Sequence, residues 1–430
     1  MECKNSALCL FDEQDVQTDI IGNSCVDYHP TTSLTSGGPI EFFVPGSTDE
    51  YIDLSDINLE VIVKLTKVKA GVSSAVVDAD KVAFINQPIS SLFQDVFMSI
   101  GDKQVEGGQH AYAYNGYLSS LLQFHPSAKK THMQAWGWNE DEPEKMNDEN
   151  NEGFKFRSKA STDAKQWQLY GPLFLNMTRQ SRYLLPQTDL TFKLLRSKAA
   201  FVIHQLAKPT SEFKIDFVKC TLWVRRVKVN NSVIAGHSSG LEKHNAIYPV
   251  QHVDLKTFTI TSGTHSTVRD RLYMSHCPKL LVVGLLDHEA FNGKLELNPF
   301  NFEHFNLNKI AIYRDGELIP GQSFTPNFSD KQYARTYANT MSSLNLFNTD
   351  DSNGLTMEHF ENGYNLYVFN LSPDATTGST HRSPLQFANL RLEMNFAKAL
   401  TKAVNVLLFA VFDAKVEITK LRDVLVSYER

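Results

Sequence analysis

The stretch that decides the fold of this chain is VNVLLFAVFDAKVEI, residues 404–418. Every second side chain in it is apolar, and these residues are Val404, Val406, Leu408, Ala410, Phe412, Ala414, Val416 and Ile418. A period of two is typical of a β-strand that buries one side against a core. Because polar residues fill alternate positions toward its end, the stretch indicates a long strand of an antiparallel sheet.

The same alternation recurs through the chain. Residues 59–66 and 390–396 also place apolar side chains on one face and mostly polar ones on the other. In residues 218–229 the apolar phase slips by one position at Arg225-Arg226. The slip fits either a β-bulge that bends a long strand or a solvent-exposed pair of arginines.

Helical spacing is rare by comparison. Apolar residues at i, i+3, i+4 and i+7 predict one amphipathic helix over residues 110–122. A second helix is expected after Ser329-Asp330, a pair suited to cap its first turn. Strands and helices do not alternate regularly, which argues against a parallel sheet. The sequence therefore predicts an all-β protein with a few short helices in long loops.

The two halves of the chain repeat the same order of elements. In the first half a strand, a glycine turn, a helix and two further strands fall at 96–100, 101–102, 110–122, 189–194 and 217–229. In the second half the corresponding elements fall at 310–313, 315–316, 330–341, 389–394 and 404–418. This repetition, about 200 residues apart, indicates a tandem duplication. Two many-stranded domains of this size favour sandwiches or jelly rolls.

The predicted organisation is an N-terminal arm (1–36), a first jelly roll (37–229), a linker (230–248) and a second jelly roll (249–430). The linker is rich in Asn, Ser and Gly and lacks periodicity. Within the first jelly roll, residues 125–168 are expected to form a long exposed insert. Seven acidic residues lie close together in this insert: Glu140, Asp141, Glu142, Glu144, Asp148, Glu149 and Glu152.

Composition excludes several classes of protein. The 42 Lys and Arg against 48 Asp and Glu give a net charge of −6, which offers no electrostatic footprint for nucleic acid. The longest apolar run, 404–412, is far shorter than the roughly 20 residues that cross a bilayer. Residues 1–20 are too acidic for a secretory signal peptide. The five cysteines lack C-x-x-C spacing and favour reduced thiols inside a cell; they are Cys3, Cys9, Cys25, Cys220 and Cys277.

Short chemical motifs are few. Residues 236–240, Gly-His-Ser-Ser-Gly, match the G-x-S-x-G nucleophile elbow, but that motif needs a strand–turn–helix context and here falls in the predicted linker. The Asp-His-Glu run at 287–289 is not H-E-x-x-H and is expected to be a polar turn. His125 and His132 are expected to be solvated. We therefore predict no catalytic, cofactor-binding or metal-binding residues and no enzyme activity. Paired glycosidase carboxylates leave no local motif, so that possibility stays open.

Several short runs carry a resemblance to a known family. They are SLFQDV (91–96), GPL (171–173), RYLL (182–185), LLRSK (194–198), VRRVKV (224–229), AFNG (290–293), NPFNF (298–302), GY (363–364) and LSPD (371–374). In number and order they resemble the major capsid proteins of the Polinton/Maverick transposons and the related adintoviruses. The resemblance spans roughly residues 58–420 and does not include the acidic insert at 140–152 or the serine-containing linker.

This resemblance implies a double jelly roll, two eight-stranded sandwiches in tandem in one chain. It implies a homotrimer that forms a pseudo-hexagonal capsomer and tiles an icosahedral shell, with penton and minor capsid proteins as further partners. It also implies a location in the virion after synthesis inside the host cell, no cofactor, and no direct sequence-specific binding of nucleic acid.

Two alternatives stay open at the level of sequence. One is a tandem jelly-roll enzyme or lectin that acts on carbohydrate, whose aromatic residues would line an exposed groove. The other is a capsid-derived protein that a host genome has retained for a task outside the virion.

Overall fold

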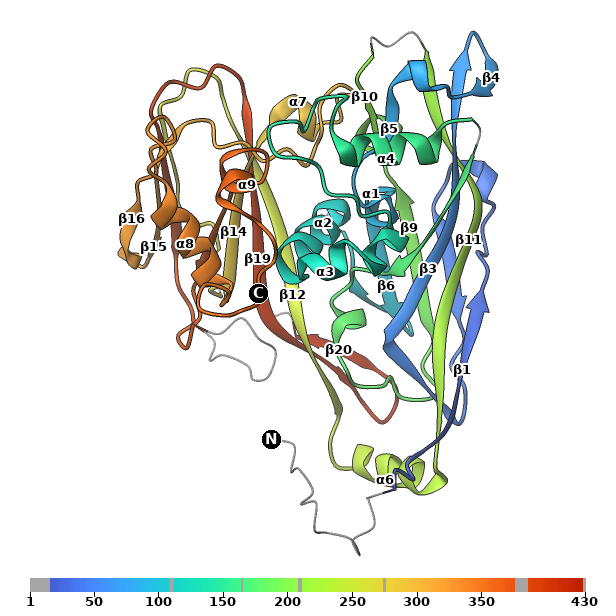
Figure 1. Ribbon diagram of the computed structural model, residues 1–430. Helices are drawn as coiled ribbons and strands as arrows, with labels where there is room; N and C mark the ends of the chain where they lie inside the picture. The colour runs from blue at the N-terminus through green and yellow to red at the C-terminus, as the bar shows by residue number, and fades with distance from the viewer. Residues whose placement is uncertain are drawn as a thin grey trace, which may run out of the picture.

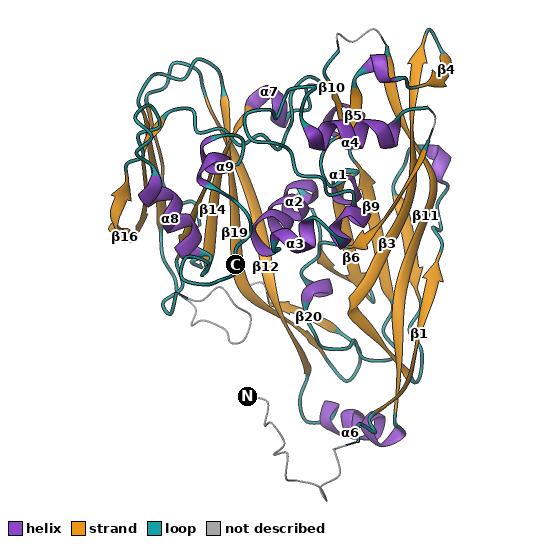
Figure 2. Ribbon diagram, viewed as in Figure 1, coloured by secondary structure: helices purple, strands orange, loops and turns teal. Residues whose placement is uncertain are grey.

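The computed structural model describes residues 16–108, 111–163, 165–207, 211–273, 276–375 and 386–427. Two groups of long strands stand side by side, the first half of the chain on the right of Figure 1 and the second half on the left. Helices and loops fill much of the space between the two groups, as the colouring of Figure 2 shows.

The first half forms two main sheets. One contains β1 (Ile20–Tyr28), β11 (Glu212–Val229), β3 (Glu50–Lys69), β8 (Gln166–Pro172) and the short β4 (Val72–Ala75). The other contains β2 (Ile40–Val44), β9 (Leu190–Arg196), β6 (Phe93–Ile100) and β7 (Lys103–Glu106). A small extra sheet pairs β5 (Val82–Phe84) with β10 (Ile203–Gln205).

The second half repeats this plan. One sheet contains β12 (Ala246–Ile260), β19 (Val404–Ile418), β14 (Leu280–Asp287), β17 (Leu366–Asn370) and the short β20 (Val424–Ser427). The other contains β13 (Ser266–Arg269), β18 (Leu390–Phe396), β15 (Leu307–Arg314) and β16 (Glu317–Phe324).

The two halves share one topology. Without the short additions β4, β5, β10 and β20, the strands of each half can be numbered 1 to 8 in chain order. In both halves the sheets then read 1-8-3-6 and 2-7-4-5. The pairs between these strands are antiparallel. This is the arrangement of an eight-stranded jelly roll. The predicted tandem jelly rolls are therefore confirmed as the fold.

The helices occupy the connections between strands. They are α1 (Pro88–Ser91), α2 (Tyr112–Gln123), α3 (Pro126–Lys129), α4 (Glu152–Ser161), α5 (Ala199–Val202), α6 (Asn231–Leu241), α7 (His288–Phe291), α8 (Ala334–Ser343) and α9 (Met357–Glu361). Short 3₁₀ turns lie at η1 (Leu34–Ser36), η2 (Asp78–Asp80), η3 (His132–Trp136) and η4 (Met177–Arg179). The helix predicted over 110–122 is α2, and the helix expected after residue 330 is α8.

The sheet β12-β19-β14-β17 is buried on both faces. In β14, Leu281 and Val283 point into the second sandwich, whereas Val282 and Leu286 belong to a separate apolar cluster on the other side. That cluster also contains residues of α2, so it joins the two halves of the chain. At its centre the ring of Tyr117 stacks on Phe300 with centroids 4.0 Å apart. Burial on both faces explains why β14 reads as a continuous apolar run.

The phase slip in β11 coincides with a break in its pairing. Val224 lies opposite Ile57 of β3, whereas the next residue, Arg225, lies opposite Asp53. Arg226 is buried, and its guanidinium donates to the hydroxyl of Tyr28. The pairing is therefore irregular where the phase slips, but the unpaired residues, 54–56, belong to β3, and β11 itself stays in register with β1 at this point. The arginine pair is not solvated as a whole, because Arg226 is buried.

The predicted N-terminal arm is wrong for residues 20–28. These residues form β1, which pairs with β11 from Ile20 opposite Val229 to Tyr28 opposite Leu222. Most side chains of β1 are exposed, so no apolar period marks the strand. Cys3 and Cys9 of the predicted arm lie outside the described residues, whereas Cys25, Cys220 and Cys277 are free thiols.

The predicted exposure of the 125–168 insert is wrong for its inner part. Trp138, Asp141 and Arg157 are almost fully buried. The acidic residues do not exclude burial because Asp141 has a cationic partner. Most of the predicted linker is likewise regular structure, since α6 begins after Asn230, whose side-chain oxygen caps the helix by accepting from Ser232 N at 3.2 Å. The division of the chain at residues 230–248 remains a prediction.

Candidate functional site

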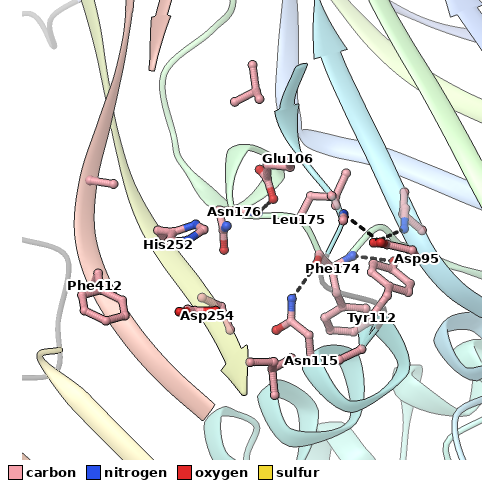
Figure 3. A pocket seen from close by; sticks show the side chains of 18 of the residues that line it. Asp95, Glu106, Tyr112, Asn115, Phe174, Leu175, Asn176, His252, Asp254 and Phe412 are labelled. Carbon is pink, nitrogen blue, oxygen red and sulfur yellow. Dashed lines mark hydrogen bonds between the residues drawn. The ribbon is translucent and has the colours of Figure 1, made fainter. Parts of the chain in front are cut away.

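A large pocket lies where the two jelly rolls meet. It has a volume of about 660 Å³. One wall comes from β6, β7, α2 and the loop at 174–176, and the other from β12 and β19 (Figure 3). The pocket is thus bounded by both halves of the chain and is the first place to look for chemistry.

Glu106 is the most perturbed acid of the pocket. Its carboxylate accepts hydrogen bonds from the backbone N–H groups of Asn176, at 2.7 Å, and Met177. Burial raises the pKa of Glu106 to about 7, although both hydrogen bonds act to lower it. Both oxygens of the Glu106 carboxylate therefore bind the backbone of the loop that follows β8.

The neighbouring polar side chains also form hydrogen bonds with backbone groups. Asp95 Oδ2 accepts from Gly108 N at 2.7 Å, and the Tyr112 hydroxyl accepts from Phe174 N at 2.9 Å. Asn115 Nδ2 donates to the Phe174 carbonyl at 3.1 Å (Figure 3). These contacts order the first wall of the pocket.

The second wall carries a cation next to an aromatic ring. Lys256 Nζ lies 4.0 Å from the ring centroid of Tyr273 and donates to the Leu272 carbonyl at 3.1 Å. Burial raises the pKa of the Tyr273 hydroxyl, which keeps this group protonated. Among the described residues no group of three or more His, Cys, Asp or Glu side chains could hold a metal ion. The contacts in both walls are hydrogen bonds and ring contacts that order the chain where the two jelly rolls meet.

A buried ion pair within the insert is hydrogen-bonded to the second half of the chain. Arg157 Nη2 donates to Asp141 Oδ1 at 2.6 Å, and both side chains are almost fully buried. From the second half, Asn298 Nδ2 donates to Asp141 Oδ2 at 3.2 Å and the Tyr364 hydroxyl donates to the Asp141 carbonyl. A buried charge pair needs such additional hydrogen bonds to be tolerated.

Lys129 makes a second polar contact between the halves. Its Nζ donates to the carbonyls of Leu121, at 2.8 Å, and Asn353, at 2.6 Å. Burial lowers the pKa of Lys129 to about 8. Lys129 lies in the insert that the sequence predicts to be exposed, yet it is buried. No local pattern marks this burial, because the fold alone brings the carbonyl of Asn353 to the lysine.

The residues singled out in the sequence do not come together as a site. Residues 236–240 lie within α6, so Ser238 is exposed on a helix and not on a strand-to-helix elbow. Asp287 caps α7 by accepting from Glu289 N and pairs with Lys402, and His288 Nδ1 lies 2.9 Å from Asn405 Oδ1. These are local structural roles.

The histidines of the insert also have local roles or contacts. His125 Nδ1 accepts from Ser127 N at the start of α3, and the His132 ring contacts Trp136. Sequence reasoning missed Glu106, Asp141 and Arg157, which carry the buried contacts. The only local signal was the acidic run around Asp141, and it suggested exposure.

Comparisons with known proteins place this geometry in context. No family model matches the chain. An uncharacterized protein of Caenorhabditis elegans, F54H12.2, is 22% identical over 369 residues, which are 84% of this chain and 86% of the relative.

Solved structures are similar over nearly the whole chain. A chain of the Sputnik virophage has a TM-score of 0.65 at 15% identity and covers 99% of this chain and 91% of its own. The mavirus major capsid protein has a TM-score of 0.59 at 10% identity and covers 99% and 93%. The Faustovirus major capsid protein has a TM-score of 0.60 at 9% identity and covers 95% and 92%. The chain has the double jelly-roll fold of viral major capsid proteins.

Within a double jelly roll, the contacts described above act as the joint between the two sandwiches. The aromatic stack around Tyr117, the Arg157–Asp141 pair and the wall around Glu106 all connect or border the two halves. In the described part of the chain, no helix is long and apolar enough to span a membrane.

Proposed function

We propose that this chain is a structural shell protein, the major subunit of an icosahedral viral capsid. The observation that carries the proposal is the repetition of one eight-stranded topology in both halves, together with the likeness to viral capsid proteins over nearly the whole chain. The polar side chains that line the junction pocket hydrogen-bond to backbone groups. The proposed function therefore depends on the shape of the subunit and on its contact surfaces, and it includes no enzymatic step and no cofactor.

The proposed assembly is a homotrimer. Three chains contribute six jelly rolls, which can form a ring with a pseudo-hexagonal outline. Such capsomers tile an icosahedral shell, with penton and minor capsid proteins at the remaining positions. We further propose that the shell belongs to the Polinton/Maverick and adintovirus lineage and that the protein resides in the virion. The net charge of −6 is consistent with leaving genome binding to other proteins.

The mass of the purified full chain tests the proposal. A trimer weighs 3 × 48.6 = 145.8 kDa, which native mass spectrometry or light scattering separates clearly from the 48.6 kDa monomer. Electron microscopy of the same sample should show hexagonal particles or closed shells. A protein that stays monomeric across protein concentration, pH and salt would refute the capsomer.

A second candidate is a capsid-derived protein retained by an animal genome. The C. elegans relative favours it, because a chain that matches most of this length is encoded in a nematode. Particles purified from the source organism distinguish the two. Closed shells that protect DNA from nuclease indicate a virion protein, whereas trimers without shells indicate a retained protein with another task.

A further inference from the structure

Equivalent sheets of the two jelly rolls are covered differently. In the second jelly roll, the outer face of β12-β19-β14-β17 packs against α2, which belongs to the first jelly roll. Helix α2 lies in the connection from β7 to β8, the fifth and sixth strands of its half. It is buried on almost all sides, including Tyr114, Tyr117 and Leu121. The contact between the two jelly rolls is thus a helix of one half laid on a sheet of the other.

The equivalent sheet of the first jelly roll, β1-β11-β3-β8, presents large side chains to solvent. Val218 of β11 is 46% exposed and Tyr170 of β8 is 41% exposed. Trp223 and Ile62 lie on the same face and are half-buried. This sheet forms the right-hand flank of the molecule in Figure 1. A partly apolar sheet face of this kind is typical of a contact surface.

Hydrogen bonds make this face rigid. The carboxylate of Glu60, at its centre, accepts from Lys219 Nζ at 3.0 Å, Trp223 Nε1 at 3.1 Å and Gln168 Nε2 at 2.8 Å. The Trp223 ring is therefore held in one orientation, so little side-chain entropy is lost when a partner covers it.

Helix α8 is the counterpart of α2 in the second half. It lies in the connection from β16 to β17, again the fifth and sixth strands. Unlike α2, it buries only one side, through Thr336, Thr340, Met341 and Ser343. The other side carries the small residues Ala334, Ala338 and Ser342, one helical turn apart; Ala334 and Ser342 are exposed, and Ala338 is half-buried. The helix belongs to the left-hand half of the molecule in Figure 1.

We propose that α8 of one copy packs on the outer face of β11-β3-β8 of the next copy. This surface pairing rests on the proposed function, because it repeats between molecules the contact that α2 makes with β12-β19-β14-β17 within the chain. Small side chains on the helix allow close approach to the large side chains of Val218, Trp223 and Tyr170.

The placement of the two surfaces suits a closed ring. They lie on opposite flanks of the chain, so each copy offers one surface to each neighbour in a head-to-tail contact. A head-to-tail contact closes into a ring when the rotation between copies divides a full turn. With three copies, helix-on-sheet contacts within and between chains then alternate around the ring.

Substitutions on each surface test the proposal in the full chain. Val218→Arg on the sheet and Ala338→Arg on the helix should each raise the protein concentration at which half the chain is trimeric by at least about tenfold, measured by native mass spectrometry. The control is Val268→Arg, since Val268 is also a strand valine, is 44% exposed and lies on β13, which is part of neither surface. The control should leave the trimer unchanged.

The possible outcomes distinguish a wrong contact surface from a wrong proposed function. Circular dichroism and thermal unfolding check that each variant is folded, and Ala338→Arg carries the test alone if Val218→Arg does not fold. Trimers that survive both substitutions, or that Val268→Arg disrupts equally, would overturn the assigned surface while leaving the capsomer in place. A wild-type chain that never trimerises would instead overturn the proposed function.

Discussion

Burial dominates the environment of Glu106, whose pKa rises from 4.5 to about 7 on folding. Because the folded state holds the proton more tightly than the unfolded state, the protonated group favours folding. Its contribution to the free energy of unfolding is fully present below about pH 4.5 and is lost as the pH rises through 7. The wall of the junction pocket is therefore more stable in mild acid.

We expect Glu106→Gln to remove this dependence. As the pH rises from 5 to 8, the wild type should lose up to roughly 3 kcal/mol of unfolding free energy relative to the variant. Urea unfolding at several pH values measures it. The control is Glu60→Gln, because burial of Glu60 is outweighed by hydrogen bonds from Lys219, Trp223 and Gln168, which lower its pKa. That variant should show no such trend. If the unfolding free energies of Glu106→Gln and wild type changed in parallel with pH, the raised pKa of Glu106 would be contradicted.

The candidate site shows why its residues escaped prediction. Glu106 is followed by two glycines and lies in no recognised motif, and its amide partners come from Asn176 and Met177. Asp141 lies in an acidic run that suggested a solvated loop, but Arg157 and Asn298 reach it from distant positions. Polar residues reveal burial only through such partners, and periodicity carries no information about them.

At the scale of elements, two glycines with opposite surroundings make a matched test. A Cβ atom on Gly284 of β14 would lie 2.6 Å from the ring of Phe302, whereas one on Gly236 of α6 would meet nothing within 4 Å. We expect Gly284→Ala to lower the free energy of unfolding by about 1–3 kcal/mol through overpacking. Gly236→Ala should raise it by up to about 1 kcal/mol, because alanine favours the helix. Chemical unfolding of both variants provides the measurement. An unchanged free energy of unfolding in Gly284→Ala would show that the ring of Phe302 moves aside at little cost.

Elements with strong local periodicity could be predicted well. The stretch 404–418 coincides with β19, and the helix expected over 110–122 is α2 at 112–123. The strand β1 was missed because its exposed side chains lack a period. Helix α6 falls within the predicted linker, because its asparagine, serines and glycines resemble loop composition and it lacks an apolar period.

At the scale of the whole molecule, the duplication was visible in the sequence but the joint between the halves was not. The order of strands within each half is local information, and it matches the topology. The joint depends on which faces meet. A signal for it existed in 404–418, where Leu407, Phe409 and Val411 occupy the alternate positions and pack against the cluster around α2. Apolar residues on both faces of one strand indicate a sheet covered on both sides.

Because apolar clusters contain residues from both halves, the two jelly rolls should unfold together. The cluster inside the first sandwich includes Tyr248 and Val416 of the second half, and the cluster around α2 joins Tyr117 to Phe300. We expect one calorimetric transition at fixed protein concentration. Phe300→Ala should lower its midpoint without splitting it, since the loss of about 3–5 kcal/mol corresponds to roughly 4 °C in a chain of this length.

The control for this prediction is Phe387→Ala, because Phe387 is 72% exposed and should leave the midpoint nearly unchanged. Two resolved transitions in the wild type would mean that each jelly roll is stable without the other. In that case the joint would only orient two independent sandwiches. A single transition that Phe300→Ala shifts and Phe387→Ala does not would show that the stacked rings couple the halves, as a subunit that presents fixed surfaces to its neighbours requires.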